Sequence, residues 1–105
     1  MLYLFTVTVA EDYSVEQYAD AWVRASRLIQ QAPGARGTRL HRKLDDPRKA
    51  LAIASWDAKA DRDAMEADPP EAVKAIIAAE APHVSIELIG EFDDPAWVVL
   101  PGDGL

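Results

Sequence analysis

Hydrophobic and polar residues follow two different periodicities in the first third of the chain. Residues 2–9 (LYLFTVTV) are rich in β-branched and aromatic side chains, which is typical of a strand. Across residues 15–29 the apolar side chains recur every three or four positions, which predicts a helix with one buried face. Ser14 and Gln17 have the spacing of a capping box at the start of this helix, and Pro33-Gly34 ends it.

The rest of the chain contains three more predicted strands and two shorter helices. Asp57 is the expected N-cap of the first of these helices, and Pro69 and Pro70 interrupt the helical pattern. The predicted elements are strands at 37–44 and 50–56 around a turn at 45–47, helices from 57 to about 67 and from 71 to about 81, and a strand at 83–92.

The order of the predicted elements is β-α-β-β-α-β, with the second helical segment broken at the two prolines. This is the order of the ferredoxin-like, or split β-α-β, arrangement, in which an antiparallel sheet carries helices on one face. The predicted fold class is therefore α+β. Residues 1–105 are expected to form a single domain, because typical domains have roughly 100–150 residues.

Two of the predicted strands are apolar on both faces, although helices can cover only one face of such a sheet. In the first strand, one face carries Tyr3, Phe5, Val7 and Val9, and the other carries Leu2 and Leu4. In the third strand, Leu51 and Ile53 lie on the face opposite Ala52, Ala54 and Trp56. We therefore predict a homodimer, in which the second face packs against the same face of another subunit. The tail at 93–105 contains a short apolar piece that could also cross to the partner.

Composition and charge exclude several classes of function. The net charge is −7 and the isoelectric point is about 4.6, so nucleic acid is disfavoured as a partner by repulsion. No apolar run approaches the roughly 20 residues that span a membrane, and the N-terminus lacks the features of a signal peptide. Because the chain also has no cysteine, and hence no disulfide framework, the expected location is the cytoplasm.

The third predicted strand ends on Trp56 after a run of small residues, where a core would usually place Val, Ile or Leu. Ala54 and Ala52 lie two and four positions earlier on the same face, so they leave open space in front of the indole. A flat apolar ligand needs this combination of one large aromatic and small neighbours. The alternative is that Trp56 only packs under the first helix, against Tyr18 or Trp22.

Several short motifs occur in a fixed order along most of the chain. They are Pro33-Gly34-x-x-Gly37-x-x-Leu40-His41-Arg42, Asp45-Asp46-Pro47, Ala54-Ser55-Trp56-Asp57 and the Asp68-Pro69 break. Together these motifs resemble the antibiotic biosynthesis monooxygenase family. The resemblance implies the dimeric α+β-barrel fold. It also implies oxidation of an aromatic polyphenol or polyketide-like molecule by molecular oxygen, with no metal or other cofactor.

The resemblance further implies a substrate cavity between the sheet and the helices, with Trp56 in its wall. The polyketide oxygenases of the family carry an Asn four residues before this Trp, where the chain has Ala52. Their tyrosine on the following helix falls near Arg62, and Lys74 is the cation near their helical arginine. The candidate catalytic residues are Trp56 and His41, and the candidate substrate-binding residues are Phe5, Tyr18, Trp22, Arg39, Ala52, Ala54, Arg62, Met65 and Lys74.

The two histidines, His41 and His83, could each act as a general base near neutral pH. They lie far apart in the sequence without HxH or HxxxH spacing, so they do not predict a metal site. The alternative for His41 is a strand residue at an edge or an interface. The basic residues between positions 36 and 49 either attract a phenolic substrate, with Arg39 the candidate, or form a solvated strand edge.

The haem-degrading branch of the family is excluded by its missing residues. That branch needs an Asn on the first strand, where this chain has Thr6 and Thr8. It also needs a Trp and an axial His on the second helix, whereas residues 58–81 contain neither.

Three functions therefore stay open. The first is a cofactor-independent oxygenase acting on a reduced polycyclic phenol. The second is a non-oxidative cyclase or isomerase with His41 or His83 as its base. The third is a non-catalytic dimer that binds a hydrophobic metabolite or partner. Oxygen consumption separates the first two, and ligand binding without turnover identifies the third.

Overall fold

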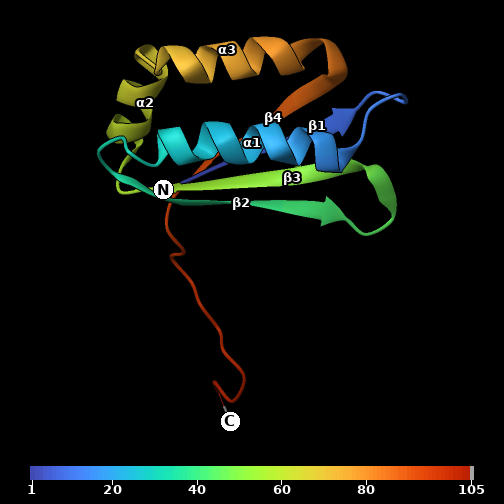
Figure 1. Cartoon of the computed structure of the whole chain (residues 1–105). Coiled ribbons are helices and arrows are strands. Elements are labelled where there is room, and N and C mark those ends of the chain that lie inside the picture. Colours follow the sequence, from blue (N-terminus) through green and yellow to red (C-terminus); the bar gives the residue numbers. More distant parts are fainter. Residues whose placement is uncertain (105) are drawn as a thin grey trace.

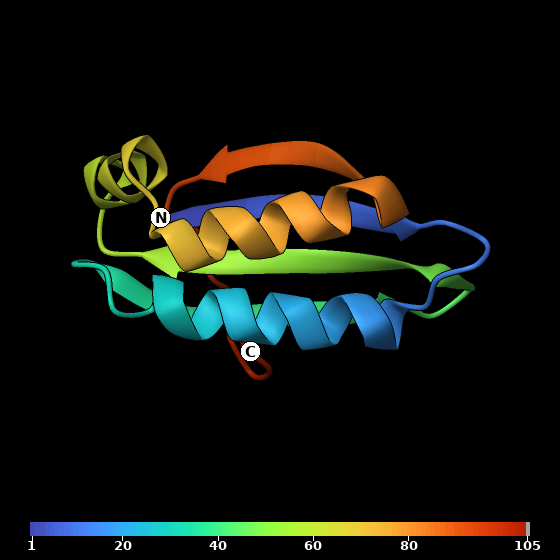
Figure 2. The same ribbon diagram turned by 45° about the horizontal axis from the view of Figure 1, so that its top comes forward.

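The computed structural model describes residues 1–104, which form a four-stranded antiparallel sheet with α1 and α3 side by side on one face (Figures 1 and 2). The strands lie in the order β2-β3-β1-β4. The elements are β1 (Leu2–Val9), α1 (Val15–Ile29), β2 (Ala35–Lys43), β3 (Asp46–Trp56), α2 (Lys59–Ala67), α3 (Glu71–Glu80), the short 3-10 helix η1 (Ala81–His83) and β4 (Val84–Phe92). The predicted α+β, ferredoxin-like fold is confirmed.

The start of α1 carries the predicted capping box. The Ser14 hydroxyl oxygen accepts a hydrogen bond from the Gln17 backbone N–H at 3.0 Å, and the Gln17 side-chain oxygen accepts one from the Ser14 N–H at 2.9 Å. Such a cap contributes about 1 kcal/mol. It fixes the point at which the helix begins, and so determines that Tyr18, Ala21 and Ala25 face the sheet.

The hairpin between β2 and β3 is longer and tighter than the sequence pattern predicts, because β3 begins at Asp46 rather than at residue 50. Pro47 therefore lies inside a strand, although proline has no N–H to donate to a neighbouring strand. The described pairing of β1 with β3 ends at Thr8 and Lys49, so Pro47 lies beyond the end of that ladder. A register shift on the β2 side accommodates the same segment.

The predicted N-cap at Asp57 is wrong. Ala58 occupies the cap position of α2, and no side chain caps this helix end. The Asp57 carboxylate instead lies 3.4 Å from the Arg36 guanidinium nitrogen Nε. Its backbone N–H donates to the Gly34 carbonyl oxygen at 2.8 Å. Asp57 thus joins the start of β2 to the end of β3.

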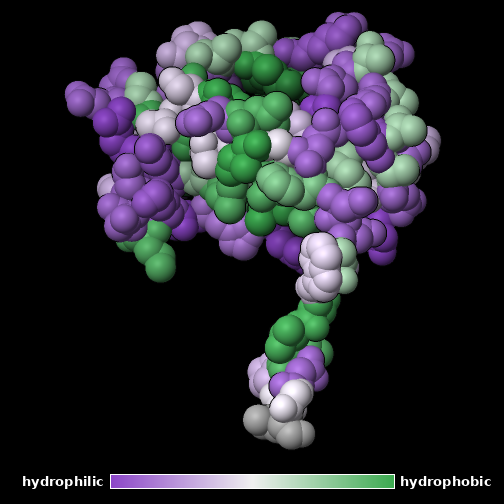
Figure 3. All heavy atoms as spheres, turned by 180° about the vertical axis from the view of Figure 1, so that it is seen from behind, coloured by the Kyte–Doolittle hydropathy of each residue, from purple (hydrophilic) through white to green (hydrophobic). Residues whose placement is uncertain are grey.

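The two faces of the sheet differ in how they are covered. On the helix side, the buried cluster consists of Val7, Val9, Val15, Tyr18 and Ala50. The opposite face carries the half-buried Leu2, Leu4, Leu51 and Ile53, which no helix covers. The edge strand β4 has exposed apolar residues on both faces. Ile86 and Leu88 pair with Val7 and Phe5 on the helix side, whereas Phe92 pairs with Leu2 on the uncovered face. Seen from behind, apolar side chains spread across the middle of the molecule (Figure 3). The homodimer stays a prediction.

The tail after β4 extends away from the body of the protein (Figure 1). Its root is fixed by the N-terminal ammonium group, which donates to the Asp94 carboxylate at 3.0 Å. Trp97 and Val99 are 91% and 82% exposed. Tail exchange between subunits stays a prediction. Within residues 1–104, no helix is both long enough and apolar enough to cross a membrane.

Candidate functional site

A cavity of about 420 Å³ lies between the sheet and the helices. This volume is within the roughly 300–1,000 Å³ range of small-molecule sites. Apolar side chains predominate in its wall, and five aromatic rings contribute to it: Tyr3, Phe5, Tyr18, Trp22 and Trp56. Rings on several sides of one space form a chamber that suits a flat apolar molecule.

The cavity results from the pairing of large residues on β1 with small residues on β3. Tyr3 is opposite Ala54, and Phe5 is opposite Ala52. Because alternate residues of a strand share a face, all four side chains are directed toward the helices. Ala54, which lines the cavity, leaves the volume next to the rings unfilled. Thr38 of β2, which is also opposite Ala54, completes this part of the wall.

Trp56 closes one end of the cavity and is only 3% exposed. Its backbone is held at the chain terminus, because its N–H donates to the Met1 carbonyl at 2.9 Å and its carbonyl accepts from the Met1 ammonium group at 2.9 Å. Tyr18 and Trp22 line the same cavity from α1. Trp56 is therefore both a buried residue under the first helix and part of a cavity wall.

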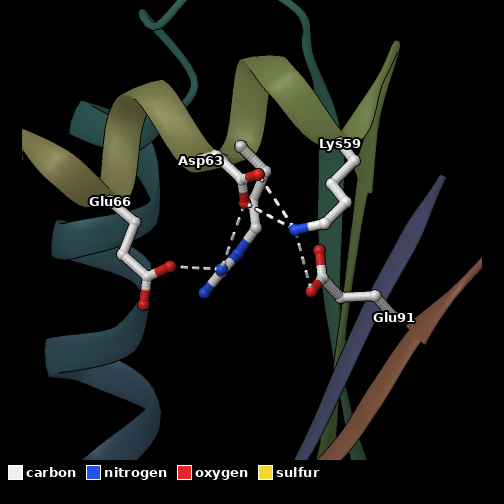
Figure 4. Close-up of polar contacts among 5 residues, drawn as sticks. Lys59, Asp63, Glu66 and Glu91 are labelled. Atoms are coloured by element: carbon white, nitrogen blue, oxygen red, sulfur yellow. Dashed lines mark hydrogen bonds and ion pairs between the residues drawn. The ribbon is translucent and has the colours of Figure 1, made fainter.

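Arg62 of α2 brings a buried positive charge to the cavity. Its side chain is 10% exposed, and its guanidinium carbon lies 3.7 Å from the centroid of the Tyr3 ring. Such a cation–π contact contributes about 0.5–2 kcal/mol. Glu66 pairs with the guanidinium group, and Asp63 lies 4.0 Å from it. Figure 4 shows Glu66 and Asp63 converging on this group, with Lys59 joining Asp63 to Glu91.

Glu80, the last residue of α3, brings a carboxylate to the cavity wall. The Tyr13 hydroxyl donates to this carboxylate, with distances of 2.7 and 2.8 Å to its two oxygens. This hydrogen bond raises the pKa of Tyr13. The Tyr13 ring stacks on His83, with ring centroids 4.4 Å apart and planes 11° from parallel.

Tyr18 presents a phenol that resists ionisation. Burial raises the pKa of Tyr18 to about 12, and the negative charge of Glu80 contributes further to the increase. The hydroxyl group therefore stays neutral across the physiological pH range. In that form it can donate or accept a hydrogen bond at the cavity wall.

The structure brings most of the residues predicted from the sequence to this one cavity. Those that line it are Phe5, Tyr18, Trp22, Ala54, Trp56, Arg62 and Met65. Ala52 lies on the same face of the sheet and is 1% exposed, but it does not line the cavity. Ala52 therefore has no direct contact with the cavity.

Three predicted site residues lie elsewhere. His41 and Arg39 pair with Leu51 and Ile53, so they belong to the face of the sheet opposite the helices and do not reach the cavity. Lys74 is exposed on α3, where its ammonium group lies 3.2 Å from the Glu71 carboxylate. The structure therefore corrects the predicted positions of these three side chains, because each points away from the aromatic chamber.

Sequence reasoning missed Tyr3 and Glu80 as residues of the site. Tyr3 shares the face of Phe5, so the alternation of β1 already contained that signal. Glu80 follows Val73, Ile76 and Ile77 at helical spacing, which places it on the same face of α3 as these apolar residues. A carboxylate that continues an apolar stripe is a sign of a polar group facing an interior space.

A second cavity, of about 350 Å³, lies where the end of α1 meets α2. It shares Ile29 and Met65 with the aromatic cavity, and Asp61 and Asp68 are among its other residues. In the part of the chain that the structure describes, no group of three or more His, Cys, Asp or Glu residues has the geometry of a metal site.

Known proteins resemble the chain in structure rather than in sequence. No protein-family model matches it, and no curated protein does so either. A candidate antibiotic biosynthesis monooxygenase from Deinococcus radiodurans has a TM-score of 0.75 at 16% identity, and the match covers 95% of this chain and 99% of that one. SnoaB, a cofactor-independent oxygenase from Streptomyces nogalater, has a TM-score of 0.72 at 15% identity, covering 91% and 96%. The chain thus has the fold of the antibiotic biosynthesis monooxygenases.

Proposed function

We propose that this protein is a monooxygenase that oxidises an aromatic, polyphenol- or polyketide-like small molecule without a cofactor. The observation that carries the proposal is the aromatic cavity with a buried guanidinium group in its wall. The names of the structural neighbours, which include a cofactor-independent oxygenase, agree with this chemistry. At 15–16% identity they support the fold, and the cavity itself supports the substrate class.

The cavity suits a fused-ring substrate that becomes negatively charged during the reaction. Aromatic walls exclude water and favour a flat ring through stacking, at about 0.5–1.5 kcal/mol per aromatic pair beyond area burial. Arg62 is permanently charged and can hydrogen-bond an oxygen on which charge develops. A buried donor of this kind stabilises an enolate or phenolate more than the neutral substrate, which is the condition for catalysis.

The overall reaction needs no external reductant. An activated methylene group loses a proton, and the resulting carbanion passes an electron to oxygen. The carbon radical and the superoxide formed in this step combine. The proton then adds to the outer oxygen, which gives a hydroperoxide. The hydroperoxide then loses water, which contains the outer oxygen, its hydrogen and the second hydrogen of the methylene group. A ketone remains. One oxygen atom thus enters the product and the other becomes water.

The two other functions make different demands on the cavity. A cyclase or isomerase with a histidine base is not favoured, because His41 lies on the other face of the sheet and His83 stacks on Tyr13 outside the cavity wall. A binding protein without activity would need the same cavity. It differs from the oxygenase only in the absence of turnover.

The test is oxygen uptake with a simple anthrone, corrected for autoxidation, for the wild type and Trp56→Phe. Phenylalanine keeps the site apolar but removes part of the ring that positions the substrate, so the accelerated rate should fall at least about tenfold. Trp97→Phe is the matched control, because Trp97 lies in the exposed tail. A folded wild-type protein that quenches its tryptophan fluorescence on adding anthrone, yet consumes no extra oxygen, would contradict the proposal and favour the binding protein.

A further inference from the structure

We propose that Glu80 is the catalytic base of the reaction and that Tyr13 is its positioning residue. The inference rests on the proposed function, since it assigns the group that removes the proton from the substrate. It concerns residues that lie at the opposite end of the cavity from Trp56 and Arg62.

Glu80 is singled out by the acid–base chemistry of the cavity wall. Among the described residues that line the cavity, it is the only carboxylate, and neither His nor Lys is present. The guanidinium group of Arg62 has only hydrogen-bond donors and no acceptor site, so it cannot serve as the base. Tyr18 is neutral and, as a phenol, is a very weak base in that form. The carboxylate of Glu80 is therefore the available proton acceptor.

The contacts of Glu80 hold its carboxylate in place while leaving it able to react. Tyr13 approaches both oxygens, at 2.7 and 2.8 Å, but its hydroxyl has a single hydrogen to donate. One oxygen at a time therefore keeps its full capacity to accept a proton. Tyr13 is itself oriented by its stacking on His83. This gives His83 an indirect role that needs no proton transfer by the imidazole.

The two charged groups of the cavity lie at different ends of it. Arg62 packs on Tyr3, near the start of β1, whereas Glu80 is held by Tyr13, which follows the end of β1. Figure 1 shows the same separation, with α2 at one end of the molecule and the end of α3 at the other. A substrate that engages both groups must carry its oxygen and its acidic C–H at opposite positions.

The aromatic ketones of the proposed function meet this requirement. A linear fused-ring ketone such as an anthrone has its carbonyl across the central ring from the activated methylene. Glu80 takes the methylene proton, and the electron pair of the broken C–H bond moves through the ring to the carbonyl oxygen. Arg62 stabilises the negative charge that develops there. Glu80 then returns its proton to the peroxide oxygen once oxygen has reacted.

Proton transfer can be measured without oxygen. Under argon in D₂O, the wild type is expected to accelerate exchange of the methylene hydrogens of anthrone. The exchange is measured as the loss of the NMR signal of these hydrogens. Glu80→Gln keeps the shape of the side chain but cannot accept the proton, so the accelerated exchange should fall at least about 100-fold. Glu71→Gln on the same helix is the matched control, because Glu71 is exposed and lies outside the cavity.

Tyr13→Phe provides a second variant that keeps the base and removes its hydrogen bond. The exchange rate at saturating anthrone should fall about tenfold while KM stays unchanged, because orientation of the base is lost and substrate binding is not. A folded Glu80→Gln protein with wild-type exchange would overturn the inference. If Glu80→Gln does not fold, an unchanged rate in Tyr13→Phe would overturn the positioning role and, with it, the proposed arrangement of the base.

The same measurements separate the inference from the proposed function. Exchange that depends on Glu80, without faster oxygen uptake in air, supports the base and rejects the monooxygenase. Faster oxygen uptake that Glu80→Gln retains supports the monooxygenase and rejects the base.

Discussion

Arg62 and Tyr18 illustrate how single residues acquire unusual properties from the cavity. Arg62 is a buried charge that the structure tolerates because Tyr3 lies beneath it and Glu66 pairs with it. Tyr18 is a phenol whose ionisation is disfavoured by burial and by the charge of Glu80. Arg62 thus brings a charge to the cavity wall, whereas the Tyr18 side chain stays uncharged there.

Tyr18 gives a prediction about alkaline pH. Its pKa is raised to about 12 from the ordinary tyrosine value of 10.0, so the folded state holds this proton over a range in which the unfolded state loses it. The stabilisation is complete below pH 10 and is lost as the pH rises from 10 toward 12. Absorbance at 295 nm should show one tyrosine titrating near pH 12, and Tyr18→Phe should remove that transition. Titration of every tyrosine near pH 10 would contradict this.

Periodicity explains which features of the elements could be predicted. The alternation in β1 and the spacing in α1 each follow from one strong pattern, and the capping box at Ser14 fixed the helix start. The placement of Trp56, Phe5, Tyr18 and Trp22 in one region follows from the same patterns. These residues could be grouped because each lies on an element whose strand or helix periodicity is clear.

The misplaced residues lie on elements without such a face. In β2 the sequence ARGTRLHRK contains one large apolar residue, Leu40, so its inward face is known only from pairing with β3. The pattern of β2 alone therefore does not show that His41 and Arg39 face away from the cavity. The helix α3 contains several alanines, so the apolar stripe that ends at Glu80 is difficult to recognise in its sequence. Aspartate is a typical N-cap residue, but the Asp57 carboxylate pairs with Arg36 and does not cap α2.

The link between β2 and α2 depends on Gly34, and this gives a prediction about stability. Gly34 has a φ of +82°, and a Cβ there would lie 2.4–2.6 Å from side-chain atoms of Asp61. Gly37 has a φ of +101° with no atom within 4 Å of such a Cβ. Gly37→Ala should cost about 1–2 kcal/mol from backbone strain alone. Gly34→Ala should cost about 1–3 kcal/mol more through the overlap.

Urea unfolding of the two glycine variants provides the comparison. Because both positions carry the same kind of backbone strain, the difference between the variants reports the overlap with Asp61. Equal losses of unfolding free energy would mean that the contact between Gly34 and Asp61 relaxes without cost, contrary to the prediction.

At the scale of the whole molecule, the two faces of the sheet differ in how they are covered. One face of the sheet is covered by helices (Figure 2) and contains the cavity. The other face carries half-buried and exposed apolar side chains, such as Leu4 and Phe92. Monomeric proteins rarely expose large continuous apolar patches. The predicted homodimer would cover this face without obstructing the cavity, which lies on the opposite side of the sheet.

The dimer can be tested by a charge at the centre of the uncovered face. Light scattering should give the wild type a mass of twice 11.5 kDa, the mass of one chain. Ile53→Lys places an ammonium group next to Leu4, its partner on β1, and should halve the observed mass. Leu44→Lys is the control, because Leu44 lies fully exposed in the β2–β3 turn. A wild type that is monomeric at all concentrations would contradict the dimer.

The most direct test of the oxygenase is the fate of labelled oxygen. Anthrone is incubated with ¹⁸O₂, with and without the wild-type protein, and the initial rate of labelled anthraquinone formation is followed by mass spectrometry. The proposed reaction predicts a protein-dependent increase in this rate, with one ¹⁸O atom in the new carbonyl group. Labelled product that forms no faster than in the protein-free solution would contradict it.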